Sequence, residues 1–140
     1  MPEVFSNAWA AACARELNGR PAYQAAAATW EGAVVLQMSG GDIDVPDRAV
    51  FLDLWHGQCR TARAAAPGDL DMAAYVLAGT IDAWRGVLEG RTAPLLAIMS
   101  GKLRITKGSL AGLAPYIGAA KELVAAATAV ETDFPEGGTD

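Results

Sequence analysis

The sequence predicts an α+β fold in which a mostly antiparallel sheet of five strands is covered by helices. The main observation is a change of hydrophobic period along the chain: helical spacing first, alternation next, then two helices, one strand and a long apolar helix. With 140 residues, 52% of them hydrophobic and 19% charged, the chain can build one core and is too short for two. We therefore predict a single domain over residues 1–130, followed by a flexible acidic tail over residues 131–140.

Two helices are predicted within the first thirty residues. Ser6 is a suitable N-cap residue, and Asn18-Gly19 ends the first helical pattern. Pro21 suits the first turn of a second, short helix, because an amide hydrogen at that position would have no partner within the helix. The apolar residues that recur at helical spacing in the first helix are Trp9, Ala12, Cys13 and Leu17.

The extended runs that follow cover residues 33–38, 48–59, 61–66 and 72–78. In the first run Val34, Leu36 and Met38 alternate with other residues and so share one face. Residues 39–42 have the composition of a turn. Because the connections between consecutive runs are short, we predict that neighbouring strands pair antiparallel, as a meander.

Helical spacing returns after the fourth run. Thr80 is placed to cap one helix, and Thr92 is placed to cap the next. The predicted apolar face of that second helix is Leu95, Leu96 and Met99. Residues 102–106 alternate cleanly and predict the fifth strand. Pro115 divides the last helical region, in which residues 116–130 include only three polar side chains.

The composition excludes several classes of function. Eleven basic and 16 acidic residues give a net charge of −5, so we expect no basic surface for nucleic acid. Cys13 and Cys59 lack CxxC spacing and are predicted to be buried, unpaired thiols, as in a reducing compartment. His56 is the only histidine, and we expect neither a metal nor another cofactor. No apolar run is long enough to span a membrane and no signal peptide is apparent, which favours a cytoplasmic protein.

Small apolar residues are unusually common in this chain. Alanine occurs 30 times, which either lets helices pack closely or leaves a lined cavity that admits an apolar guest. The last helix is apolar on nearly all sides, so it must be buried, cover something apolar or meet another surface. It is therefore interpreted as a lid over a cavity, a dimer contact or a dock for lipid.

The second half of the chain resembles the sterol carrier protein 2-like (SCP2-like) family. The resemblance is carried by residues 75–84 (YVLAGTIDAW), by Val87-Leu88-Glu89-Gly90 and by residues 93–105 (APLLAIMSGKLRI). It extends more loosely over residues 6–130. It implies a five-stranded sheet with helices that enclose a hydrophobic tunnel for lipids such as fatty acids, acyl-CoA and sterols, and it implies no catalytic residues. Ser109 stands where many members carry Asp, which leaves contacts to the ligand headgroup open.

Periodicity and resemblance together predict a noncatalytic protein that binds a lipid or another apolar small molecule, for transfer, storage or presentation. The predicted floor of the tunnel is Val34, Leu36, Leu54, Val76, Leu103 and Ile105. The predicted wall is Trp84, Leu88, Leu95 and Met99, and the predicted lid is Tyr116, Ala120, Leu123 and Val124.

Two other classes of function stay open at this point. The apolar last helix is suited to oligomerisation, including a homodimer, or to an accessory role beside an enzyme, and transient membrane contact is equally compatible with it. A small enzyme with a hydrophobic pocket would use Asp53 or His56 as a base, which requires one of these side chains to point into the cavity.

Overall fold

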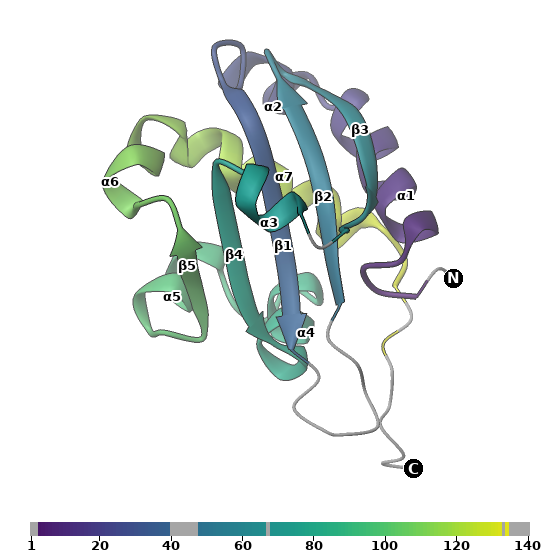
Figure 1. Ribbon diagram of the computed structural model, residues 1–140, viewed down its shortest axis with the longest axis vertical. Helices are drawn as coiled ribbons and strands as arrows, with labels where there is room; N and C mark the ends of the chain where they lie inside the picture. Colours follow the sequence, from purple (N-terminus) through teal and green to yellow (C-terminus); the bar gives the residue numbers. More distant parts are fainter. Residues whose placement is uncertain (1–2, 40–47, 67, 133, 135–140) are drawn as a thin grey trace.

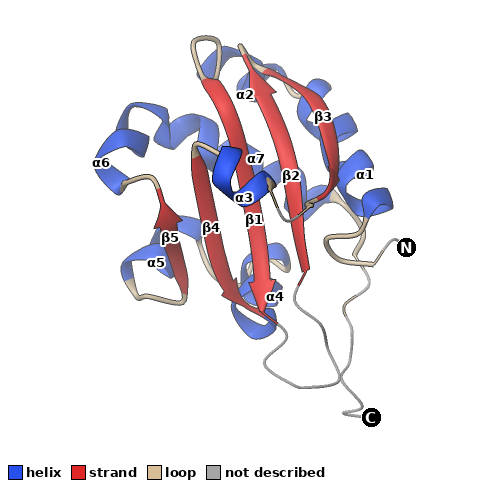
Figure 2. Cartoon of the chain, viewed as in Figure 1, coloured by secondary structure: helices blue, strands red, loops and turns tan. Residues whose placement is uncertain are grey.

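The computed structural model describes residues 3–39, 48–66, 68–132 and 134, which form a five-stranded mixed sheet with helices (Figures 1 and 2). The strands are β1 (Glu31–Ser39), β2 (Arg48–Trp55), β3 (Gln58–Ala64), β4 (Tyr75–Thr80) and β5 (Leu103–Lys107). The helices are α1 (Asn7–Asn18), α2 (Pro21–Ala26), α3 (Asp69–Met72), α4 (Ile81–Leu88), α5 (Pro94–Met99), α6 (Leu110–Leu113) and α7 (Ile117–Ala129), with a 3-10 turn η1 (Ala114–Tyr116) before α7. The predicted α+β class and the mostly antiparallel sheet are confirmed.

The order of the strands differs from the predicted meander. The sheet runs β3-β2-β1-β4-β5, and β1 pairs with β4 in parallel, with Val35 beside Val76. The other neighbouring pairs are antiparallel. The meander was wrong for one connection: after β3 the chain passes through α3, which packs on β1, and β4 then joins the edge of β1 that β2 leaves free. A crossover of this kind is what allows a parallel pair.

The predicted strand over residues 48–59 is in fact a hairpin. β2 ends at Trp55, and β3 begins at Gln58, after a turn of two residues. His56 and Gly57 have φ angles of +49° and +84°, which is typical of the tight two-residue turns that match the twist of a hairpin. Glycine is required at position 57, since a Cβ there would lie 2.7 Å from the Gln24 carbonyl oxygen.

Side-chain caps and a proline set the ends of several helices. The Ser6 hydroxyl accepts from the Trp9 amide at the start of α1, and the Thr80 hydroxyl accepts from the Ala83 amide at the start of α4, as predicted. The prediction that Thr92 caps the next helix is wrong, because α5 begins at Pro94 with Ala93 in the N-cap position. The predicted division of the last helical region near Pro115 is confirmed by the 3-10 turn η1 between α6 and α7.

The helices cover the two faces of the sheet unequally. α3 lies on the near face in Figure 2, where it joins a small apolar cluster around Val35. The larger core lies on the other face, under α1, α2, α4 and α7. Cys13 and Cys59 are buried in it and unpaired, as predicted. This arrangement leaves the inner face of the sheet and α7 opposite each other.

Part of the segment predicted as a tail contacts this core. The Trp9 indole donates to the Thr132 hydroxyl over 2.9 Å, and Phe134 is buried. Most of that segment, and the predicted turn at residues 39–42 apart from Ser39, lie outside the described residues. Within the described part of the chain, no helix is both long and apolar enough to cross a membrane.

Candidate functional site

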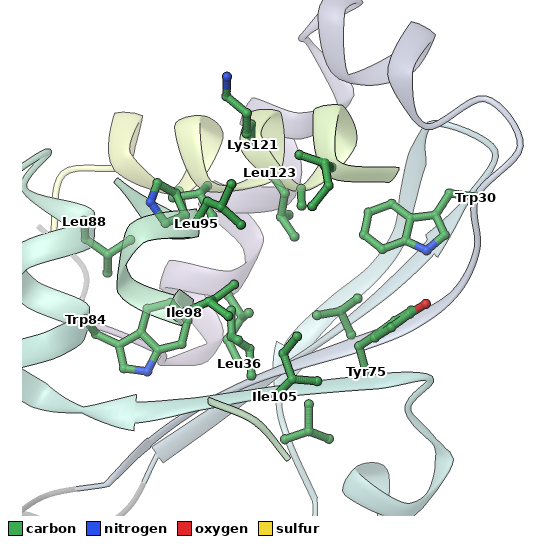
Figure 3. Close-up of a pocket in the computed structure, with 18 residues that line it drawn as sticks. Trp30, Leu36, Tyr75, Trp84, Leu88, Leu95, Ile98, Ile105, Lys121 and Leu123 are labelled. Atoms are coloured by element: carbon green, nitrogen blue, oxygen red, sulfur yellow. The ribbon is translucent and has the colours of Figure 1, made fainter. Parts of the chain in front are cut away.

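An apolar cavity lies between the inner face of the sheet and helices α4, α5 and α7. Its volume is about 70 Å³, and Lys121 is the one charged residue among the 18 residues that line it (Figure 3). The lining residues are Trp30, Val34, Leu36, Tyr75, Val76, Leu77, Trp84, Leu88, Pro94, Leu95, Ile98, Ile105, Ile117, Ala120, Lys121, Leu123, Val124 and Ala127.

Strand register brings the floor of the cavity together. In the parallel pair Leu36 lies beside Leu77, and across the next pair Leu77 lies beside Ile105. Because successive side chains of a strand point to opposite faces, alternate residues of three strands meet on the helix-covered face. Val76 also borders the cavity, although it packs with Val35 in the cluster on the opposite face.

The Trp84 side chain forms a fixed wall. Its indole nitrogen donates to the Gln37 carbonyl oxygen over 2.8 Å, and the residue is 1% exposed. The Phe5 ring packs edge-on against the indole at 5.2 Å. A buried indole needs a hydrogen-bond acceptor for its N–H group, which here is the Gln37 carbonyl oxygen. The hydrogen bond therefore fixes the orientation of the ring that closes one end of the cavity in Figure 3.

Three aromatic rings close the opposite end. Trp30 stacks on Tyr116 with ring centroids 5.5 Å apart, and it packs edge-on against Tyr75 at 6.4 Å. Tyr75 can take this position because residue 108 is glycine, with a φ of +87°; a Cβ there would lie 2.4 Å from the tyrosine ring. Beyond the rings lies a second depression, which is lined by the same three aromatic residues and by the charged residue Glu31. The aromatic group thus separates the apolar cavity from a polar part of the surface.

Most of the predicted site residues meet at this cavity. Those that line it are Val34, Leu36, Val76, Trp84, Leu88, Leu95, Ile105, Ala120, Leu123 and Val124. The other predicted residues lie elsewhere. Leu54 and Leu103 are fully buried away from the lining, Tyr116 borders the polar depression, and Met99 is 72% exposed.

Sequence reasoning missed eight lining residues: Trp30, Tyr75, Leu77, Pro94, Ile98, Ile117, Lys121 and Ala127. On β4 the predicted floor residue was Val76, but Tyr75 and Leu77 alternate with it and lie on the helix-covered face. In α5 the buried side is Ala97 and Ile98, whereas Leu96 and Met99 point to solvent, so the predicted apolar face was rotated.

The candidate base residues lie outside the cavity. The exposed His56 places its Nε2 atom 2.5 Å from a carboxylate oxygen of Glu31 and stacks on Trp55. Asp53 forms an ion pair with Arg60 at 3.1 Å. Neither side chain lines the cavity. Within the described residues, no three His, Cys, Asp or Glu side chains gather in a way that could hold a metal ion.

Comparison with known proteins gives the same assignment as the motifs. A family model described as the SCP-2 sterol transfer family matches residues 11–113. The chain belongs to this family. The resemblance seen in the sequence is therefore confirmed. A search of curated proteins returned no match.

Solved structures of this family share the fold. A crystal structure of sterol carrier protein 2 is 44% identical, with a TM-score of 0.82, and the match covers 92% of this chain and 100% of the other. A conserved hypothetical protein from Thermus thermophilus, described as possibly a sterol carrier protein, is 43% identical, with a TM-score of 0.81 and coverage of 99% of this chain and 96% of the other. A complex of the Aedes aegypti sterol carrier protein-2 with the C16 fatty acid palmitate is 15% identical, with a TM-score of 0.53 and coverage of 84% and 92%. Membership in a family of lipid-binding and transfer proteins follows from these matches.

Proposed function

We propose that this chain binds one fatty acid without catalysis, with the acyl chain in the apolar cavity and the carboxylate at the rim beside Lys121. The observation that carries the proposal is the lining itself, which is apolar apart from that single cation. Burial of an acyl chain is favourable by about 0.8 kcal/mol per methylene, so an apolar cavity binds a long chain with few polar contacts. The absence of Asp53 and His56 from the lining supports a noncatalytic role.

The size of the cavity favours a thin, flexible ligand. At about 70 Å³ it holds only a few carbon atoms as it stands. A longer chain therefore has to part the lining side chains, and aliphatic groups such as Leu95, Ile98 and Leu123 can do so by changing rotamer. A single acyl chain needs less widening than the rigid rings of a sterol. The same fold holds palmitate in the Aedes aegypti protein.

The position of Lys121 favours a ligand with a carboxylate headgroup. In Figure 3 its ammonium group points away from the cavity while the base of the side chain borders it. This placement suits a ligand whose tail is buried and whose anionic end reaches the surface. The next residue, Glu122, forms an ion pair with Arg20 at 3.4 Å, which helps to fix this turn of α7.

A displacement titration tests the proposal. A fluorescent fatty acid is bound to the purified, delipidated chain and then displaced by saturated fatty acids from octanoate to palmitate. We expect the affinity to rise about fourfold per methylene until the cavity is full. Lys121→Met should weaken palmitate but not the matched fatty alcohol. An affinity independent of chain length, or displacement by a sterol alone, would contradict the proposal.

Transfer of the bound lipid between membranes and delivery to an enzyme are two uses of the same site. Mixing loaded protein with acceptor vesicles separates them, since transfer predicts that the fluorescent ligand moves to the vesicles without another protein. The cytoplasmic location inferred from the sequence stays a prediction, and the two unpaired thiols fit it.

A further inference from the structure

The two edges of the sheet differ in how their backbone is covered. β3 forms one edge and β5 forms the other. Along β3, the Asn18 side chain of α1 accepts from the Cys59 amide over 2.8 Å and donates to the Cys59 carbonyl oxygen over 3.1 Å. Asn7, at the other end of the same helix, accepts from the Ala64 amide over 2.7 Å. Two side chains of α1 thus satisfy backbone groups that a neighbouring strand could otherwise pair with.

The backbone at the β5 edge has no comparable cover. β5 pairs with β4 on one side. On the other side, within the described part of the chain, no hydrogen bond reaches the backbone of residues 103–107. Figure 1 shows β5 as the last strand at its side of the sheet, and Arg104 and Thr106 are exposed. A free edge of this kind presents N–H and C=O groups that can pair with another extended chain.

The free edge is also basic. Residues 100–109 contain Lys102, Arg104 and Lys107 and no aspartate or glutamate, in a protein of net charge −5. The Lys107 ammonium donates to two carbonyl oxygens of α3. Lys102 and Arg104 are exposed, and among the described residues neither forms an ion pair. Basic residues on a short edge strand discourage pairing with neutral or basic strands, and they favour an acidic one.

We propose that the free edge of β5 binds an extended acidic segment of another protein, which adds to the sheet as a sixth strand. Backbone hydrogen bonds to residues 103–107 supply the affinity, and carboxylates beside Lys102 and Arg104 supply the selectivity. Because Ile105 of the same strand lines the cavity, the partner lies next to the lipid site. The binding of the segment requires no ligand in the cavity, so it does not rest on the proposed function.

An acidic segment fits this edge better than a second copy of the chain does. If two β5 edges paired with each other, Lys102 and Arg104 of both copies would meet in one small interface, where like charges repel. The β3 edge of a second copy is covered by α1 and offers no free backbone. An acidic segment instead supplies both the missing backbone partners and the opposite charge.

Titration of the full chain with a defined peptide tests the proposal. The probe is a synthetic peptide with blocked ends in which Glu and Val alternate, and binding is followed by the backbone amide NMR signals of the protein. We expect amide shifts and slowed hydrogen exchange at residues 103–107 and not along β3. A peptide with Lys in place of Glu should bind at least about fivefold more weakly, since its charges are repelled. A version with every backbone amide N-methylated keeps the charge but cannot donate, and should bind at least about tenfold more weakly.

Matched variants separate this edge from general charge effects. We expect Arg104→Glu to weaken binding of the acidic peptide about fivefold or more, because an attractive pair becomes a repulsive one. Arg15 is exposed on α1, which covers the opposite edge, so Arg15→Glu should bind the peptide as the wild type does. Arg104 does not line the cavity, so Arg104→Glu should keep its fatty-acid affinity. Thermal unfolding of each variant shows whether the fold is retained.

Four outcomes would overturn the proposal. They are a wild-type chain that does not bind the acidic peptide, equal binding of the N-methylated peptide, slowed exchange along β3 instead of β5, and a dimer that pairs through β5 and excludes the peptide. Absence of fatty-acid binding with intact peptide binding would instead contradict the proposed function and leave the strand addition standing.

Discussion

Filling the cavity with a larger side chain should weaken ligand binding without unfolding the protein. Ala120 lies on α7, is half-buried and lines the cavity. The substitution Ala120→Leu adds three carbon atoms to a space of about 70 Å³. If these atoms displace three methylenes of an acyl chain, binding loses about 2.4 kcal/mol at ~0.8 kcal/mol per methylene. That loss corresponds to roughly 50-fold weaker binding.

The matched control is the same substitution on the exposed side of the same helix. Ala129 is exposed and does not line the cavity, so Ala129→Leu should leave binding unchanged. Both variants should unfold within a few degrees of the wild type, since the cost of crowding in Ala120→Leu is offset by filled space. The assay is displacement of the fluorescent fatty acid by palmitate, with thermal unfolding in parallel. A stable Ala120→Leu variant with wild-type affinity would refute the view that the ligand occupies this cavity.

Other side chains give further predictions. Trp84→Phe removes the donor to the Gln37 carbonyl, so urea denaturation should show a loss of about 1–3 kcal/mol in the free energy of unfolding. Hydrogen bonds from Arg63 and the Ala66 amide lower the pKa of Asp69, so Asp69→Asn should reduce stability at neutral pH. A lowered folded-state pKa stabilises only where the unfolded carboxyl is ionised, so the difference between Asp69→Asn and the wild type should shrink as the pH falls below about 4. Burial raises the pKa of Cys13 to about 12 and that of Cys59 to about 11, so a thiol reagent at pH 8 should react only after denaturant unfolds the chain.

The sequence was most informative where a feature depends on neighbouring residues. The caps at Ser6 and Thr80 were correct because a hydroxyl and an amide three residues later belong to one turn. The inner face of β1 was predicted correctly, because Val34 and Leu36 alternate with other residues along the strand and both line the cavity. The parallel pair of β1 and β4 was missed because it joins residues about forty positions apart, and no local pattern records that pairing.

The same limit explains the errors around the cavity. Every residue of α5 is apolar, so no polar side chain marked the side that faces solvent. Met99 was therefore predicted to line the cavity, whereas the structure places Ile98 there. Trp30 was not among the predicted site residues, yet its ring lines the cavity and contacts Tyr75 and Tyr116. These three rings come from separate segments of the chain, which only the folded structure brings together. Helix caps and the alternation within β1 were therefore predictable, whereas the ends of the cavity were not.

The many alanines posed two alternatives, close packing of helices and a lined cavity, and both occur on α7. One side packs against α1 and α2, where Ala119 and Ala126 are buried, because small side chains allow close approach of helices. The side that borders the cavity includes Ala120 and Val124. Close packing and an unfilled space thus occur together, and both depend on alanine. The large exposed apolar side chains beside this part of α7 are Leu95, Leu96 and Met99 of α5, because in a helix of six apolar residues not all can turn inward.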